Sequence, residues 1–205
     1  MKTLLTNCLF IIFLILMSCN NSPKSDKAKD SQVKADQEHL KDDLSPIEKG
    51  IGFAMQTQRV LASNLISEIN ANGTVGAISF CSEKAYPLTD SMALALNVKL
   101  KRVSDKPRNT KNKANKKEAD YISKSKDILA KGEEIKPEMT EVNGKLVGYY
   151  PIITNQICMQ CHGNQKTDVM QETLTQLEKL YPDDKGMGYK INELRGIWVV
   201  EMDKE

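Results

Sequence analysis

One short motif, Cys158-Met159-Gln160-Cys161-His162, constrains the fold of this chain more than any other part of its 205 residues. Its two cysteines stand three positions apart, and a histidine follows the second one directly. Thiols at this spacing can form thioethers to both vinyl groups of a haem while the adjacent imidazole reaches the iron. The motif therefore predicts one covalently bound haem c, around which the chain has to fold.

Two other uses of this spacing are the alternatives. A structural zinc ion takes four nitrogen or sulfur ligands, and only Cys81 could supplement the motif, because His39 lies in a polar N-terminal segment. A C-x-x-C pair also forms redox-active dithiols and structural disulfides, but no thioredoxin-like βαβ pattern surrounds it here. We therefore favour haem attachment over both.

The N-terminus indicates export. Lys2 precedes an uncharged apolar run over residues 9–17, which is too short to span a bilayer comfortably and is typical of a secretion signal. The sequence Leu16-Met17-Ser18-Cys19 resembles the bacterial lipoprotein box. Residues 1–18 are therefore predicted to be a signal peptide and Cys19 the acylated first residue, with an uncleaved membrane anchor as the alternative. In either case we expect an extracytoplasmic protein on a bacterial membrane, in the periplasm or at the outer membrane.

Composition divides the mature chain into two parts. Residues 19–44 are mostly Asn, Ser, Lys, Asp and Gln, with little to bury, so we expect a disordered tether. Residues 45–205 have the size of one compact domain. Loss of the signal removes Lys2 and lowers the formal net charge from +2 to +1. This weak charge, together with export, argues against a nucleic-acid partner.

The supply of cysteines and histidines limits the ligands that could face His162 across a haem. The chain has five cysteines and two histidines; Cys8 leaves with the signal, Cys19 takes the lipid, and His39 lies in the tether. The second axial ligand then has to be a cysteine thiolate, a methionine, a weaker donor or an open position. Cys81 has an alanine four residues away on each side, which would let a flat macrocycle approach. The methionines that remain open as ligands are Met92, Met139, Met170 and Met187.

Hydrophobic periodicity and turn residues predict an α+β fold in which N-terminal helices pack on a small antiparallel sheet. The first helix should follow a Ser45 cap with Pro46 at its first position, and Asn72-Gly73 should break it. The expected helices cover residues 47–69, a second segment that carries Cys81 and ends near Pro87, residues 88–95, and residues 167–180. The expected strands cover residues 97–104, 145–154 and 194–201.

Residues 98–117 contain nine Lys or Arg and one Asp, an excess of +8. For the lysines of residues 111–117 we favour a solvated loop. Arg102 and Arg108 are candidates for a more specific role, because the guanidinium group matches a carboxylate with two parallel hydrogen bonds. We expect one of these two arginines to contact a haem propionate.

Taken in order, several segments resemble the family of single-haem PAS-like domains, long catalogued as a domain of unknown function. These domains occur alone or as extracytoplasmic sensor modules. The likeness covers roughly residues 48–202. The matching segments are Ala77-Ile78-Ser79-Phe80-Cys81, Lys101-Arg102-Val103-Ser104, Arg108-Asn109, Asn112, Tyr150-Pro151-Ile152, the motif through Gly163, Gly188-Tyr189 and Leu194-Arg195-Gly196. The resemblance implies a PAS-like fold and His/Cys ligation, with His162 as the proximal ligand and Cys81 as the distal one.

Redox or small-ligand sensing is the function that these features favour, because a thiolate ligand lowers the haem potential and its release would open a coordination position. The domain extends to Glu205, and this sequence shows no kinase, cyclase or receptor region after it. We therefore expect a signalling partner protein. The alternative is an electron-transfer cytochrome whose basic segment docks an acidic redox partner. A peroxidase is the least favoured reading, because the domain has no second histidine for acid–base chemistry, and we do not expect an enzyme.

Overall fold

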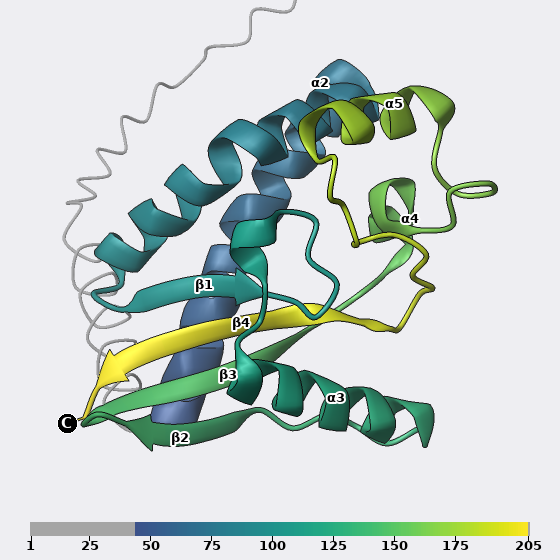
Figure 1. The fold of residues 1–205 in the computed structure, drawn as a ribbon. Coiled ribbons are helices and arrows are strands. Elements are labelled where there is room, and N and C mark those ends of the chain that lie inside the picture. Colours follow the sequence, from purple (N-terminus) through teal and green to yellow (C-terminus); the bar gives the residue numbers. More distant parts are fainter. Residues whose placement is uncertain (1–43, 205) are drawn as a thin grey trace, which may run out of the picture. The chain divides into compact units, whose positions relative to one another are not determined.

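The computed structural model describes residues 44–204 (Figure 1). The expected signal peptide, the lipidation site at Cys19 and nearly all of the expected tether lie outside these residues. The elements run in the order α2 (Pro46–Ala95), β1 (Lys99–Val103), the short 3-10 helix η1 (Thr110–Asn112), α3 (Lys116–Ala130), β2 (Glu138–Val142), β3 (Lys145–Ile153), α4 (Gln156–His162), α5 (Gln171–Leu180) and β4 (Leu194–Asp203). Within this described part, no helix is both long and apolar enough to cross a membrane.

The strands form one antiparallel sheet in the order β1-β4-β3-β2. The three predicted strands are present as β1, β3 and β4, and the expected α+β architecture is confirmed. The sequence analysis missed β2. This strand lies at the edge of the sheet and none of its residues is fully buried, so it carries only a weak hydrophobic pattern.

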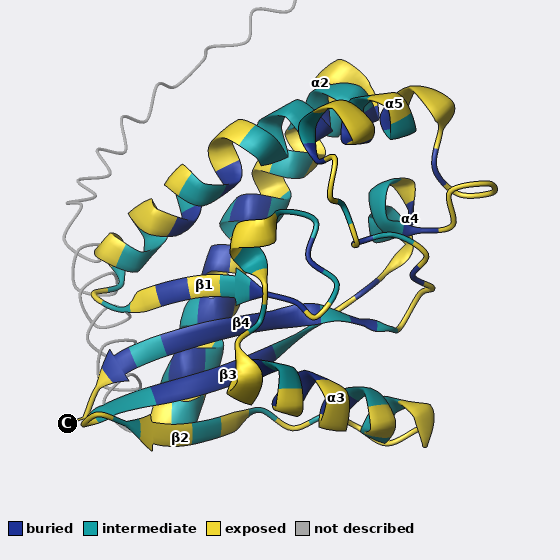
Figure 2. Cartoon of the chain, viewed as in Figure 1, coloured by how far each residue is buried: buried dark blue, intermediate teal, exposed yellow. Residues whose placement is uncertain are grey.

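Helices cover both faces of the sheet, and each face packs against them in an apolar core (Figure 1). Side chains alternate between the faces along a strand, and β4 is buried along most of its length (Figure 2). Its apolar run therefore supplies both cores. The core against α2 includes Ala54, Leu61, Tyr150, Trp198 and Val200. The core against α3 includes Tyr121, Ile122, Ile197 and Val199.

The start and the break of α2 agree with the sequence prediction. Pro46 is the first residue of the helix, and the backbone N–H of Ser45 donates to the Glu48 carboxylate over 2.9 Å. Gly73 interrupts the helix with a φ of +64°, which glycine adopts without the steric cost that a side chain would add. The helix therefore consists of two arms that meet at Gly73.

The predicted end of the second arm near Pro87 is wrong, because α2 continues through Pro87 to Ala95. A proline inside a helix removes one hydrogen bond, here to the carbonyl of Glu83. Both residues are exposed, so water can satisfy that carbonyl. Residues 88–95 thus belong to α2 and are not a separate helix.

Later in the chain, α5 begins at Gln171, four residues later than predicted, after a turn over residues 165–168.

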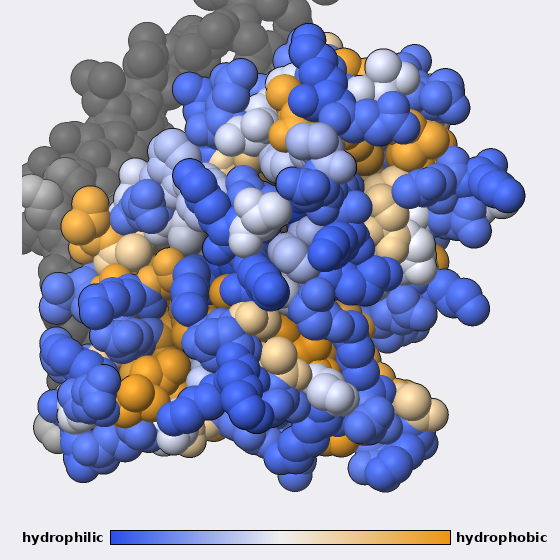
Figure 3. All heavy atoms as spheres, in the orientation of Figure 1, coloured by the Kyte–Doolittle hydropathy of each residue, from blue (hydrophilic) through white to orange (hydrophobic). Residues whose placement is uncertain are grey.

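The lysine-rich segment is more ordered than expected. Its four lysines within residues 111–117 are exposed, as expected, but Lys116 and its neighbour begin α3 instead of lying in a loop. The side chain of Asn115 caps this helix by accepting from the backbone N–H of Glu118 over 3.0 Å. Hydrophilic side chains dominate the face of the domain seen in Figure 3. A helix with so few apolar residues is difficult to distinguish from a solvated loop by sequence alone.

Candidate cofactor site

The Cys-x-x-Cys-His motif lies in the short helix α4, and two residues separate this helix from the end of β3. Asn155 caps the helix, and its Oδ1 accepts from the backbone N–H of Ile157 over 3.1 Å. Cys158 and Cys161 are close to one helical turn apart, so they lie on the same side of α4. That side faces a cavity.

The cavity has a volume of about 320 Å³, which lies within the range of about 300–1,000 Å³ that is typical of small-molecule sites. Both arms of α2, the ends of β1, β3 and β4, the segment after β1 and α4 contribute to its wall. The four residues predicted as attachment thiols and axial ligands all line it: Cys81, Cys158, Cys161 and His162. The fold therefore brings Cys81 to the cavity that the motif faces, although 77 positions separate it from Cys158 in the sequence.

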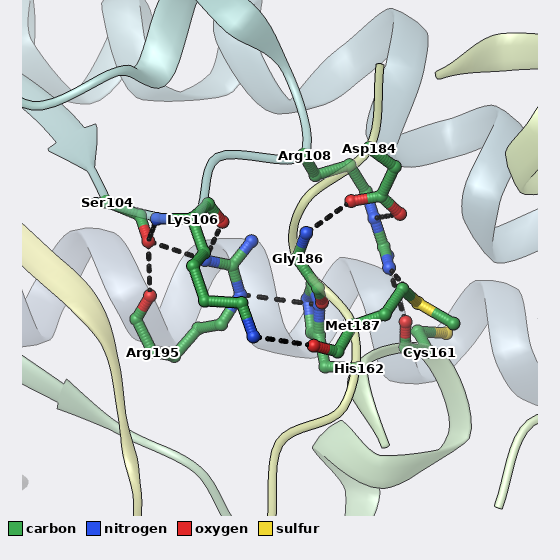
Figure 4. Close-up of polar contacts among 9 residues, drawn as sticks. All are labelled: Ser104, Lys106, Arg108, Cys161, His162, Asp184, Gly186, Met187 and Arg195. Carbon is green, nitrogen blue, oxygen red and sulfur yellow. Dashed lines mark hydrogen bonds and ion pairs between the residues drawn. The ribbon is translucent and has the colours of Figure 1, made fainter. Parts of the chain in front are cut away.

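The backbone holds the His162 ring from behind (Figure 4). The ring Nδ1 lies 2.6 Å from the carbonyl oxygen of Gly186, and because a carbonyl has no proton, Nδ1 carries the hydrogen. Arg195 Nε lies 3.3 Å from the same nitrogen; it is a neighbouring charge, because a protonated nitrogen cannot accept its N–H. Burial, reinforced by the charges of Arg108 and Arg195, lowers the pKa of His162 well below its usual value. The imidazole is thus neutral and its Nε2 lone pair is available to a metal.

The two candidate arginines have different surroundings. Arg108 Nε donates to Asp184 over 2.8 Å, and both side chains are 10% exposed; its Nη2 also donates to the carbonyl of Cys161. Arg102 lies over the Trp198 ring, 5.4 Å from its centroid. Among residues 44–204, no hydrogen-bond or ion-pair acceptor faces the Arg102 guanidinium. Both arginines line the cavity, but in the described part of the chain Arg108 uses its Nε and one Nη nitrogen as donors, whereas none of the Arg102 donors has an acceptor.

Carboxylates are missing from the cavity wall. Three arginines line it, namely Arg102, Arg108 and Arg195, and none of the lining residues in the described part of the chain is Asp or Glu. Arg195 donates to neutral acceptors, the Ser104 hydroxyl over 2.9 Å and the Lys106 carbonyl over 3.1 Å. Asp184 compensates Arg108 from outside the wall. The cavity is therefore positively charged and fits a ligand that brings negative groups.

Cys81 lies on the second arm of α2. Burial raises the pKa of its thiol, and the nearby charges of Arg102 and Arg108 act in the opposite direction. Its alanine neighbours at Ala77 and Ala85 are buried. The four methionines that remained open as ligands lie elsewhere: Met92, Met139, Met170 and Met187 are all absent from the lining of this cavity.

The alternatives of zinc and dithiol chemistry find little support in the geometry. Within residues 44–204, His, Cys, Asp and Glu side chains form no group of three or more that could hold a metal ion, so the four ligands of a structural zinc site are not assembled. The described cysteines are free thiols. Burial raises the pKa of Cys161 to about 11, whereas redox-active C-x-x-C pairs need a lowered pKa.

Sequence reasoning missed the residues behind His162. Asp184 and Gly186 received no role from the sequence, and Arg195 appeared only as part of a segment that matches the family. The contacts of Gly186 and Arg195 with His162 join parts of the chain more than twenty residues apart, and the spacing of residues gives no signal for them. The Pro182-Asp183-Asp184-Lys185-Gly186 sequence indicates a tight turn, which is the feature that places the Gly186 carbonyl.

A comparison with family models matches residues 24–202 to the family described as Tll0287-like. The chain belongs to the Tll0287-like family. This result confirms the family resemblance drawn from the sequence. Among solved structures, the chain is similar to the cyanobacterial haem-protein Tll0287, with a TM-score of 0.56 and 15% sequence identity over 79% of this chain and 98% of that one. At this identity the likeness to Tll0287 shows the shared fold alone. No curated protein matches the chain.

Proposed function

We propose that this member of the Tll0287-like family binds one haem c, with Cys158 and Cys161 as attachment thiols and His162 and Cys81 as axial ligands. The observation that carries the proposal is the cavity in which these four side chains meet three arginines and, in the described part of the chain, no carboxylate. Haem brings two propionates, and the positive wall fits those charges. The name of the similar structure, a haem-protein, points the same way.

Each residue has a separate task in this proposal. Gly186 holds the Nδ1 proton of His162, which leaves Nε2 as the metal-binding atom. The two motif thiols would fix the macrocycle, and Arg102 supplies hydrogen bonds for a propionate. Cys81 as a thiolate would bind the oxidised form more tightly than the reduced form, because ferric iron carries one more positive charge to compensate the thiolate in a buried site. The bound haem would supply one-electron chemistry and, at an open position, binding of a small gas.

Spectra of the purified protein test the ligand set. We expect a haem that stays attached after denaturation and an iron–sulfur charge-transfer band in the oxidised state. Cys158→Ala with Cys161→Ala should abolish the attachment, and Cys81→Ala should abolish the band. Met92→Leu is the control, because Met92 packs in the core against α2. A band that persists in Cys81→Ala would remove Cys81 from the ligand set.

We propose redox or small-ligand sensing as the role of the haem, through a partner protein at the membrane to which Cys19 would anchor the chain. This role rests on Cys81: a ligand that binds one oxidation state better than the other opens a position when the state changes. We do not propose an enzyme, because no second histidine and no carboxylate lines the cavity in the described residues.

Electron transfer is the second candidate, supported by the exposed lysines within residues 111–117 as a docking surface for an acidic partner. Addition of carbon monoxide to the reduced protein separates the two roles. Rapid binding that displaces the sulfur ligand supports sensing, whereas a haem that keeps both ligands in both oxidation states supports electron transfer.

A further inference from the structure

The loop between α5 and β4 forms a closed circuit of hydrogen bonds with α4 (Figure 4). The circuit begins at His162 Nδ1, which donates to the Gly186 carbonyl over 2.6 Å. The Gly186 N–H donates to Asp184 Oδ1 over 2.6 Å. The other oxygen of Asp184 accepts from Arg108, and Arg108 returns to α4 by donating to the carbonyl of Cys161. We call this set of contacts the proximal circuit.

Asp184 is the member of the proximal circuit that joins its two halves. One of its oxygens fixes the peptide of Gly186, and the other fixes Arg108. Its side chain is 10% exposed, so water competes little for these oxygens. Without the carboxylate, the Gly186 N–H would lose its acceptor, and the Gly186 Cα, with the carbonyl that receives the His162 proton, would be held less firmly.

The position of Gly186 is constrained from the opposite side as well. A Cβ atom added to Gly186 would lie 2.6 Å from Arg195 Nη2 and 3.1 Å from Asp184 Oδ1. The backbone at Gly186 therefore passes between the Arg195 guanidinium and the Asp184 carboxylate. Two further backbone bonds hold the loop to the end of α4, from Gly188 N–H to the Gly163 carbonyl and from Tyr189 N–H to the His162 carbonyl, each 2.9 Å long.

We propose that Asp184 is a positioning residue for His162. Asp184 fixes the backbone of Gly186, and the Gly186 carbonyl in turn keeps the Nδ1 proton of His162 in a short hydrogen bond. The proposal rests on the ligation by His162 proposed above. A strong acceptor at Nδ1 makes an imidazole a more basic metal ligand. A more basic ligand favours oxidised over reduced iron, so Asp184 lowers the reduction potential of the haem.

Three substitutions, two at Asp184 and one at the neighbouring Asp183, separate this positioning role from a simple effect of charge. Asp184→Ala removes both the charge and the acceptor for Gly186 N–H. Asp184→Asn removes the same charge but keeps an oxygen that can accept this N–H. Asp183→Ala removes a charge from the adjacent, exposed position of the same turn. The reduction potential of each haem-loaded protein is measured by a spectroscopic redox titration.

We expect Asp184→Ala to shift the equilibrium toward reduced iron by about tenfold, which corresponds to about 59 mV for one electron. Asp184→Asn should shift it by less than half as much in millivolts, and Asp183→Ala by less still. Equal shifts in Asp184→Ala and Asp184→Asn would show a charge effect alone and overturn the proposal, as would the absence of a shift in both.

A second readout uses the Nδ1 proton itself, observed by nuclear magnetic resonance in the reduced, diamagnetic protein. Its exchange with solvent should accelerate at least about tenfold in Asp184→Ala and remain close to wild type in Asp184→Asn. If Asp184→Ala gives no folded protein, Asp184→Leu replaces it, because its side chain also lacks an acceptor for the Gly186 N–H. Wild-type protein without attached haem would instead contradict the proposed function, so the two failures can be told apart.

Discussion

Among the arginines of the site, Arg102 is the one whose hydrogen-bond donors find no acceptor in the described residues. Its guanidinium carries five N–H donors, yet within residues 44–204 it lies against the face of Trp198 and has no hydrogen-bond acceptor. Removal of a charged group from water costs several kcal/mol unless a partner compensates it. The haem-free protein therefore bears a free-energy cost at Arg102 that a bound carboxylate would relieve.

Arg102→Met should consequently change stability in opposite directions in the two forms of the protein. In haem-free protein it should raise the free energy of unfolding by about 1–3 kcal/mol, because a buried charge without an acceptor disappears. In haem-loaded protein it should lower the free energy of unfolding by about 2–3 kcal/mol, because a propionate loses its partner. Urea unfolding of both forms measures the effect, with Cys158→Ala and Cys161→Ala combined to give the haem-free form.

Arg108→Met is the matched control for this prediction. Arg108 already pairs with Asp184 and the Cys161 carbonyl, so its loss should destabilise both forms. If Arg102→Met destabilises the haem-free protein as well, Arg102 has a structural partner and is not reserved for a ligand.

At the residue scale, sequence reasoning located the side chains that would bond to a haem but missed those that hold them. The motif is local, and its spacing alone specifies Cys158, Cys161 and His162. Cys81 followed from counting the remaining cysteines and from the family resemblance. The Gly186 carbonyl reaches His162 because the loop after α5 folds back on α4, and Arg195 reaches it from the start of β4. Such contacts leave no periodic trace in a single sequence.

Among the elements, the kink of α2 has the clearest effect on the site, because both arms of the helix line the cavity. Gly73 has a φ of +64°, and an added Cβ would meet no atom within 4 Å. Gly73→Ala should therefore destabilise through backbone strain and not through a clash, lowering the free energy of unfolding by about 1–3 kcal/mol. Chemical denaturation of the purified domain measures this change.

Gly52→Ala is the control within the same helix. Gly52 is exposed, its added Cβ would also meet no atom within 4 Å, and its φ is not positive. Alanine should therefore stabilise this position by about 0.5–1 kcal/mol through its higher helix propensity. Two stabilising substitutions would mean that the kink at Gly73 is not required by the fold.

Prediction of elements succeeded where an apolar pattern was strong and failed where polar residues did the packing. β4 has the run Ile197-Trp198-Val199-Val200, which no exposed loop would carry. α3 instead packs with Glu118 in the interior, where its carboxylate pairs with Lys101 over 2.6 Å. A buried carboxylate that belongs to a mostly polar helix and pairs with a half-exposed lysine looks like solvated surface in the sequence.

At the scale of the whole molecule, the location of the protein depends on residues outside the described domain. We expect wild-type protein to incorporate labelled palmitate at Cys19 and to fractionate with membranes. Cys19→Ala should lose the label and move to the soluble extracytoplasmic fraction, because a protein without acyl chains has no anchor. Cys8→Ala is the control, since Cys8 would leave with the signal peptide. Membrane association of Cys19→Ala would favour an uncleaved apolar anchor.

The strand order also governs when the site can be completed during biosynthesis. β4 lies between β1 and β3 and supplies Arg195 and Trp198 to the cavity wall, yet it is synthesised after every other described element. A growing chain that has already exposed residues 158–162 still lacks β4, one of the two interior strands of its sheet. Pairing between such distant segments is slow, and until it occurs the motif thiols remain accessible. This delay provides an interval in which a large planar cofactor can be bonded before the domain closes around it.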